Sequence, residues 1–262
     1  MSLVIDRLTE HYKFIEKDYN DSNIVGIFLI GSQNYNMDTI NSDIDTKFII
    51  TPTLNDIYLN HKAESSTKKF PDSNEYISIK DIRCVLSEFK KQGTLLEILF
   101  TDYAIVNPLY KPVWQELINH REEIARYNPY LVAKATKGIL YNTYERLYNK
   151  EGKISPKQVS NLVRLEYFIQ NYIEQKNYSN CIKPEGDKHD YIIQIKNGEL
   201  GETSLITIAE SSFKAANLLI DTYCQRDDLP KNNPNLEEFF YDITKQFIDT
   251  SLITEYARNG EI

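Results

Sequence analysis

The front of the chain alternates between short apolar runs and amphipathic stretches. Residues 3–18 carry apolar side chains at helical spacing, which predicts an N-terminal helix. The runs NIVGIFLIG (23–31) and LLEILF (95–100) are short and apolar, and both predict strands. DIDTKFII (43–50) alternates before it becomes apolar throughout, which predicts a third strand. The other expected front elements are a helix opened by Thr53, a loop over 61–75, a strand over 75–79 and a helix over 80–93 closed by Gly93.

After about residue 108 the pattern becomes helical. Prolines stand where several helices would begin, because proline fits the first helical turn. A short run, YIIQI (191–195), predicts a strand or an extended segment. The expected helices cover 112–125, 128–148, 156–175, about 203–225 and 235–257.

This layout predicts an α+β fold. We expect a mixed β-sheet flanked by helices in a first domain over 1–125. A mostly helical second domain would follow over 126–262.

Composition narrows the classes of function. The 262 residues, 41% of them hydrophobic, are enough for one large or two modest domains. A net charge of −8 argues against a whole-molecule electrostatic grip on nucleic acid. No apolar stretch approaches the ~20 residues that span a bilayer. Cys84, Cys181 and Cys224 lack metal or redox spacing, and the first residues lack a secretory pattern, so we expect a cytoplasmic protein.

Two aspartates open the strand over 43–50. Residues i and i+2 of a strand share a face, so Asp43 and Asp45 are expected to project together. Adjacent carboxylates repel each other unless a cation joins them. Mg²⁺ is commonly held by one or two carboxylates together with substrate phosphates, and two such ions can assist a phosphoryl displacement. The pair therefore indicates a metal site, although many Asp-x-Asp pairs only solvate a strand end.

Gly31 and Ser32 end the preceding apolar run. Glycine lets a backbone approach a phosphate closely, and N–H groups in a turn attract the anion. The Ser32 hydroxyl adds a donor. A glycine-serine turn alone is usually only a loop. The order of this turn and the aspartates, each bordered by an apolar strand, indicates a phosphate cradle beside a metal site.

The stretch GSQNYNMDTINSDIDTKFI resembles the signature of the DNA polymerase β-type nucleotidyltransferase superfamily. The form GSxxYG…SDID is closest to a branch of predicted nucleotidyltransferases from bacteria and phages. The resemblance is sharp over 24–50, fair to about residue 100 and faint beyond. It implies a nucleotidyltransferase-type sheet, with Gly31, Ser32, Tyr35 and Ser42 binding nucleotide. Asn36 replaces a glycine of the branch, and we expect it to keep the left-handed backbone.

A third acid is implied by the same resemblance, on a strand that follows a helix. Glu97 in LLEILF fits that place, and an acid inside an apolar run needs a partner. Its implied role is general base for the attacking hydroxyl, or ligand of the second metal. Asp43 and Asp45 would each bind Mg²⁺, with Asp45 bridging both ions. Glu75 and Asp81 are the alternatives, and Glu97 could also be an ordinary solvent-facing residue.

The helix over 156–175 carries a polar stripe. Lys157, Asn161 and Arg164 share one face, and Asn161 stands where the related branch has histidine. Lys157 and Arg164 could hold a nucleotide's triphosphate, because Lys and Arg are the usual phosphate donors. An ordinary solvated helix face explains the stripe equally well.

Together these features predict an enzyme that uses a nucleoside triphosphate and two Mg²⁺ ions, for which Mn²⁺ could substitute. It would transfer the nucleoside monophosphate to an acceptor hydroxyl on an RNA end, a protein or a small molecule, and release pyrophosphate. The alternative is a catalytically weak, antitoxin-like module of the same fold that binds a nucleotide or a protein partner. The sequence does not choose the triphosphate, the acceptor or the oligomeric state.

Overall fold

The computed structural model describes residues 2–39, 42–230 and 233–259, and the chain divides into two compact units. The first unit combines Met1–Asn34, Asp43–Tyr127 and Asn233–Ile262. The second combines Tyr35–Ser42 with Asn128–Asn232. This division differs from the predicted domains, 1–125 and 126–262, in two places. The short segment 35–42 joins the helical unit, and the C-terminal helix joins the sheet.

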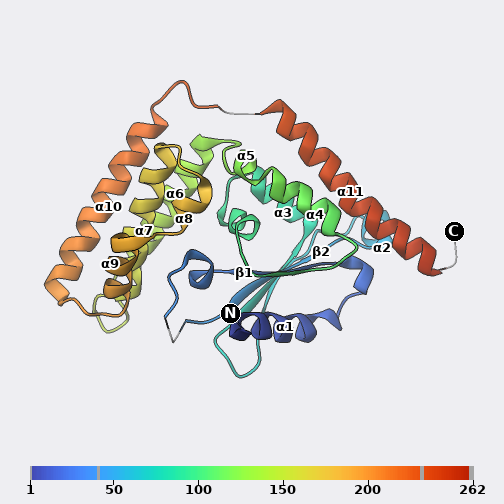
Figure 1. The fold of residues 1–262 in the computed structure, drawn as a ribbon, viewed down its shortest axis with the longest axis horizontal. Coiled ribbons are helices and arrows are strands. Elements are labelled where there is room, and N and C mark those ends of the chain that lie inside the picture. The colour runs from blue at the N-terminus through green and yellow to red at the C-terminus, as the bar shows by residue number, and fades with distance from the viewer. Residues whose placement is uncertain (1, 40–41, 231–232, 260–262) are drawn as a thin grey trace. The chain divides into compact units, whose positions relative to one another are not determined.

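The first unit is built on a five-stranded mixed sheet with the order β3-β4-β2-β1-β5 (Figure 1). β2 runs antiparallel to β1 and parallel to β4, whereas the two edge strands are antiparallel to their neighbours. The strands are β1 (Ile24–Ile30), β2 (Asp45–Ile50), β3 (Ser65–Lys69), β4 (Tyr76–Asp81) and β5 (Ala104–Val106).

Alternation along β2 divides its side chains between the two faces of the sheet. Phe48 and Ile50 pack with Ile15 of α1 (Ser2–Glu16) in a core that also contains residues of β1 and β4. Asp45 and Lys47 belong to the opposite face, because side chains alternate along a strand. α1 therefore covers one face, and the acidic motif faces away from it.

The opposite face is covered by helices, among them α3 (Ile82–Lys90) and α4 (Lys111–Asn119) (Figure 1). Trp114 lies against Phe28 of β1, with ring centroids 4.3 Å apart. The C-terminal helix returns to the same unit, where Phe247 stacks on Tyr110. The remaining helices of the first unit are α2 (Leu54–Tyr58), α5 (Arg121–Ala125) and α11 (Pro234–Asn259).

The second unit is a bundle of helices with its own core. α7 (Pro156–Ile173) is its central element and packs against α6, α9 and α10. Leu162 and Ile169 of α7 are fully buried, and Tyr144 of α6 stacks on Phe213 of α10. The remaining helices are α6 (Pro129–Glu145), α8 (Tyr178–Ile182), α9 (Gly186–Lys196) and α10 (Glu202–Cys224).

The predicted α+β class, a mixed sheet flanked by helices and followed by a helical region, is confirmed. Four local predictions are wrong. LLEILF forms a 3₁₀ helix, η3 (Thr94–Leu99), and YIIQI lies inside α9. The loop expected over 61–75 contains β3, and the helix over 112–125 is two helices. Tertiary packing overrides the local preference for a strand or a loop in these segments. In YIIQI, for example, Ile192 and Ile195 are fully buried and lie three residues apart on one helix face.

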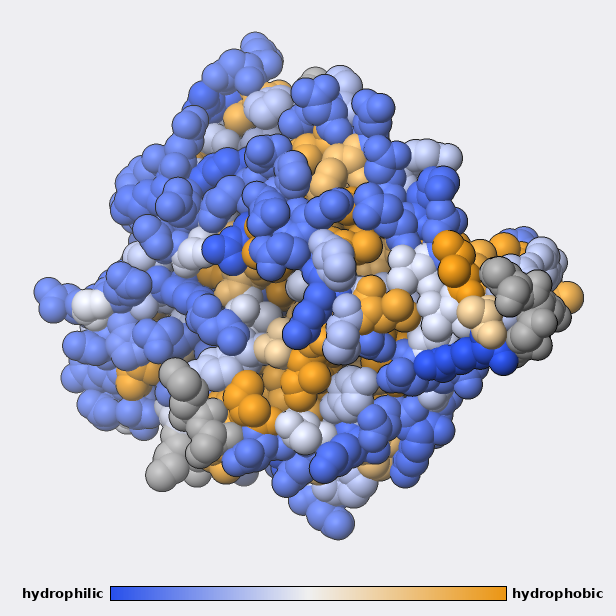
Figure 2. Space-filling view, turned by 45° about the vertical axis from the view of Figure 1, so that its right-hand side comes forward, coloured by the Kyte–Doolittle hydropathy of each residue, from blue (hydrophilic) through white to orange (hydrophobic). Residues whose placement is uncertain are grey.

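None of the described helices is long and apolar enough to cross a bilayer. The face drawn in Figure 2 is mainly hydrophilic, with hydrophobic side chains gathered in smaller patches. The three cysteines are free thiols.

Candidate nucleotide and metal site

The turn at the end of β1 is built around two left-handed residues. Gly31 has φ of +81°, and Asn36 has φ of +57°. Between them, Ser32–Tyr35 form a short 3₁₀ helix, and the Asn34 N–H donates to the Gly31 carbonyl at 3.0 Å. A Cβ added to Gly31 would meet nothing within 4 Å, so the conformation, and not the space, favours glycine here. The expectation that Asn36 adopts the left-handed backbone is confirmed.

Glu97 reaches this turn from a distant part of the chain. Its carboxylate oxygen Oε2 accepts the Gly31 N–H at 3.2 Å, and its backbone carbonyl accepts the Asn34 side-chain amide at 3.1 Å. Glu97 is buried, in the 3₁₀ helix η3 and not in the predicted strand. The structure thus joins two of the predicted site residues, Gly31 and Glu97.

The strand register places Asp45, one of the two aspartates, beside the turn that follows β1. Ile30 of β1 is the partner of Asp45 in β2, and Gly31 follows Ile30 directly. Partner residues of antiparallel strands have Cα atoms roughly 4.5–5.5 Å apart. Asp45 begins β2, and its Oδ1 accepts the Tyr76 N–H at 2.9 Å. Asp43 is exposed and precedes the strand, so it does not share the regular strand geometry that was expected of the pair.

A buried carboxylate fixes the backbone between the two aspartates. Glu75 accepts the Ile44 N–H through Oε1 at 3.2 Å. Its Oε2 accepts the Arg7 Nε–H at 2.6 Å and lies 3.2 Å from His11 Nε2, both on α1. Glu75 therefore supports the motif from the α1 face.

The other alternative third acid lies at the far end of the sheet. Asp81 is the register partner of Ile50, five residues beyond Asp45 along β2. It caps α3 and holds the Arg83 guanidinium through both oxygens, at 3.0 and 2.7 Å. Its position and its partners give Asp81 a structural role.

Lys47 is a site residue that we did not single out from the sequence. It lies two residues after Asp45 on the same face and is half-buried. Burial lowers the pKa of its ammonium group, whereas the Glu97 and Asp45 carboxylates act in the opposite direction. A cation held near these acids reduces their mutual repulsion. Its sequence signal is a lysine that continues the alternation of Asp43 and Asp45 along the start of this strand.

The described residues contain no cluster of three His, Cys, Asp or Glu side chains placed to hold a metal together. That description includes Asp43, Asp45 and Glu97, so the chain alone does not gather them into a closed cage. The carboxylates of Asp43 and Asp45 still fit Mg²⁺, because this ion is commonly held by one or two carboxylates. Water and substrate phosphates usually complete its shell. Metal binding at this site stays a prediction.

The remaining predicted residues belong to the second unit. The Arg164 guanidinium lies over the Tyr35 ring, 4.4 Å from its centroid. Lys157 is exposed at the first turn of α7, and Ser42 lies in the segment 35–42. Tyr35 and Arg164 are thus brought together. Their roles toward a nucleotide stay predictions.

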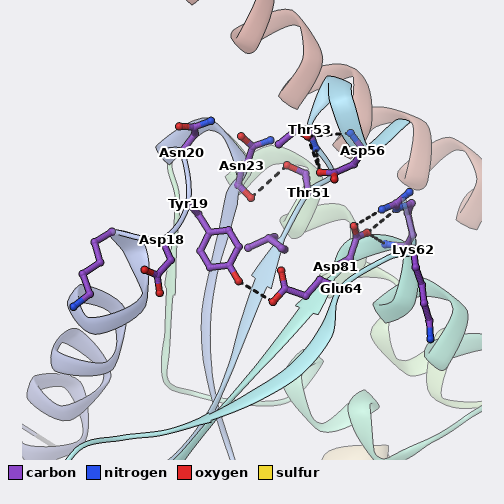
Figure 3. A pocket seen from close by; sticks show the side chains of 13 residues that line it. Asp18, Tyr19, Asn20, Asn23, Thr51, Thr53, Asp56, Lys62, Glu64 and Asp81 are labelled. Carbon is purple, nitrogen blue, oxygen red and sulfur yellow. Dashed lines mark hydrogen bonds and ion pairs between the residues drawn. The ribbon is translucent and has the colours of Figure 1, made fainter. Parts of the chain in front are cut away.

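A polar pocket of about 460 Å³ opens at the other end of the sheet, beside Thr51 and Asp81 (Figure 3). Its carboxylates already have partners. Glu64 accepts the Tyr19 hydroxyl at 2.9 Å, and Asp56 accepts the N–H of Thr53, the N-cap of α2, at 2.9 Å. Apart from Asp81, the alternative third acid that already holds Arg83, the described lining of this pocket includes none of the predicted site residues, so we assign it no part in the site.

Comparisons with known proteins add little to this geometry. No protein-family model matches the chain, and no curated protein matches its sequence. One similar solved structure is that of a nucleotidyltransferase-like protein from Exiguobacterium sibiricum 255-15. The two sequences are 10% identical, the match covers 96% of this chain and 91% of that chain, and the TM-score is 0.32. Backbones that superpose this loosely do not decide function, which we infer from the chain's own residues.

Proposed function

We propose that this protein is a metal-dependent nucleotidyltransferase. The observation that carries the proposal is the bond between Glu97 and the Gly31 N–H, at the turn that the strand register sets beside Asp45. This bond joins Glu97 to the turn, and Asp45 is paired with Ile30, the residue before the turn, which supports a site shared by the turn, the aspartates and Glu97. Burying Glu97 costs stability unless it is compensated, which favours a functional reason for its position.

The reaction is a displacement at the α-phosphorus of a nucleoside triphosphate. The acceptor's hydroxyl oxygen forms the new bond to phosphorus, the bond to the bridging oxygen of the β-phosphate breaks, and pyrophosphate leaves. Bound Mg²⁺ would neutralise the phosphates and the developing charge. Asp43 and Asp45 would hold it, while Glu97 would take the hydroxyl proton or bind a second ion.

Contacts to the nucleotide would come from donors and cations. The Gly31 N–H already donates to Glu97, so the phosphate cradle would rest on the Ser32 hydroxyl and the turn that follows. Lys157 and Arg164 would contact the triphosphate, because their charge suits phosphate oxygens.

Incubation with each labelled nucleoside triphosphate, Mg²⁺ and a panel of RNA, protein and small-molecule acceptors tests the proposal. We expect the wild type to label one class of acceptor. Asp43→Asn and Asp45→Asn keep the shape but remove the charge, and each should lower the rate by about 100-fold or more.

The matched control is Asp72→Asn, at an exposed turn position with φ of +52° that asparagine also adopts. This variant should keep the wild-type rate. Equal rates for the wild type and both motif variants would refute the transferase. Calorimetric binding of Mg²⁺ and nucleotide without turnover would instead support the alternative, a nucleotide-binding module.

A further inference from the structure

Lys196, the last residue of α9, holds the segment Tyr35–Ser42 from within the second unit. Its ammonium group donates to the Met37 carbonyl and, at 3.3 Å, to the Ser42 hydroxyl. Met37 is buried, with 3% of its surface exposed. A charged side chain from another element thus fixes both the middle and the end of this segment.

Two hydrogen bonds join Thr39 and the same serine near the far end of the segment. The Ser42 N–H donates to the Thr39 carbonyl at 2.8 Å, and the Thr39 N–H donates to the Ser42 hydroxyl oxygen at 2.8 Å. Lys196 therefore bonds to the same hydroxyl that accepts from Thr39. The next residue is Asp43, so the bonds that hold Ser42 bear on the direction in which the chain enters the acidic motif.

The surroundings of Lys196 are unfavourable for a cation with a purely structural role. Burial lowers the pKa of its ammonium group, and the charge of Lys157 lowers this pKa further. The charge of Asp38 raises it. Among the described residues no carboxylate forms an ion pair with Lys196, and its recorded partners are neutral oxygens. A half-buried ammonium without an ion pair costs stability, which a methionine of similar length would avoid.

We propose that Lys196 is a positioning residue of the nucleotidyl-transfer site. By fixing Met37 and Ser42 it sets the geometry of the segment that joins the Gly31-Ser32 turn to Asp43. This inference rests on the proposed function, because a positioning residue needs a reaction to serve. Lys196 acts through the segment and contacts no reacting atom.

Lys196→Met keeps the side-chain length and removes the ammonium donors. We expect kcat to fall about tenfold or more while the KM for the nucleotide stays within about twofold, since misplacement of the motif affects the reaction more than ground-state binding. Lys196→Arg retains donors for both oxygens and should recover most of the rate. Lys188→Met on the same helix removes a lysine that lies over the Tyr191 ring, and should behave as the wild type.

Amide hydrogen exchange supplies a readout that does not need activity. In Lys196→Met, peptides covering 35–42 should exchange about tenfold faster or more, while α7 and the buried turns of α9 keep their protection. Lys188→Met should leave the segment unchanged.

The outcomes separate the two proposals. Unchanged exchange over 35–42, unchanged kcat, or a loss confined to KM would overturn the positioning role. A wild type without transferase activity would defeat the proposed function and the positioning role with it, while faster exchange in Lys196→Met would still establish the tether.

Discussion

At the residue scale, the backbone conformations of two residues shape the turn that follows β1. Gly31 and Asn36 take the left-handed region at the two sides of a 3₁₀ turn, and this geometry presents the Gly31 N–H to Glu97. A residue with a Cβ pays roughly 1–2 kcal/mol in that region. The glycine is required by its φ, because the space beside it is open.

Two glycine-to-alanine changes test this explanation. Gly31→Ala should destabilise the first unit by roughly 1–2 kcal/mol. Gly138→Ala, also without neighbours within 4 Å but inside α6, should stabilise the second unit by about 0.5–1 kcal/mol, because alanine is the better helix former. In urea unfolding, fluorescence of the single tryptophan, Trp114, reports the first unit, whereas circular dichroism follows the helices of both units. A shift in circular dichroism without a shift in Trp114 fluorescence is therefore assigned to the second unit. Changes of the same sign would contradict the explanation.

At the element scale, the contact between α1 and the sheet contains a polar network beneath the motif. His11 is fully buried, with Nδ1 3.0 Å from the Thr46 hydroxyl and Nε2 3.2 Å from Glu75. Burial lowers the pKa of His11, although the Glu75 carboxylate opposes that shift and Arg7 adds to it. The folded protein therefore favours the neutral imidazole.

Stability should consequently decline in mild acid. Below the unfolded histidine pKa of about 6.5, the unfolded chain binds a proton that the folded chain resists, so the free energy of unfolding falls as the pH falls. Urea unfolding at pH 7.5, 6.5 and 5.5 should show a steeper decline for the wild type than for His11→Gln. His120→Gln is the control and should decline like the wild type, because the His120 ring nitrogen faces the Glu116 backbone carbonyl and not a carboxylate. Parallel curves for wild type and His11→Gln would remove His11 as the cause.

At the scale of the whole molecule, the chain leaves the first unit and returns to complete it. The final helix, α11, belongs to the unit of the sheet although the helical unit precedes it. Phe240, Ile243 and Phe247 of α11 are almost fully buried. The Ser251 hydroxyl accepts bonds from Asn23 and Thr51, both at 2.9 Å. The first unit therefore needs residues from both ends of the chain.

Two substitutions on α11 test this assignment. Phe247→Ala removes a ring stacked on Tyr110 and should cost about 3–5 kcal/mol in unfolding monitored by Trp114. Tyr241→Ala, with the native side chain 69% exposed, should change stability by less than about 0.5 kcal/mol. If Phe247→Ala left the Trp114 transition in place, α11 would not be part of the first unit's core.

Several local structures could not be predicted because their stabilising partners are remote. Ser65–Lys69 has little apolar character, yet it forms β3 through backbone pairing with β4 at the sheet edge. Leu96, Ile98 and Leu99 of η3 are buried, and their apolar run could not distinguish a strand from a 3₁₀ helix. The left-handed residue after α3 is Gln92, with φ of +55°, and not the expected Gly93.

The sequence by itself determined the features that depend on near neighbours. The glycine-serine turn, the spacing of Asp43 and Asp45, the left-handed Asn36 and the amphipathic helices follow from local backbone preferences and side-chain periodicity. Only the tertiary structure decided which distant groups meet. It bonded Glu97 to Gly31, placed Glu75 behind Ile44 and tied Ser42 to Lys196. Those contacts join residues 31 to 154 positions apart, and packing, not local preference, selects them.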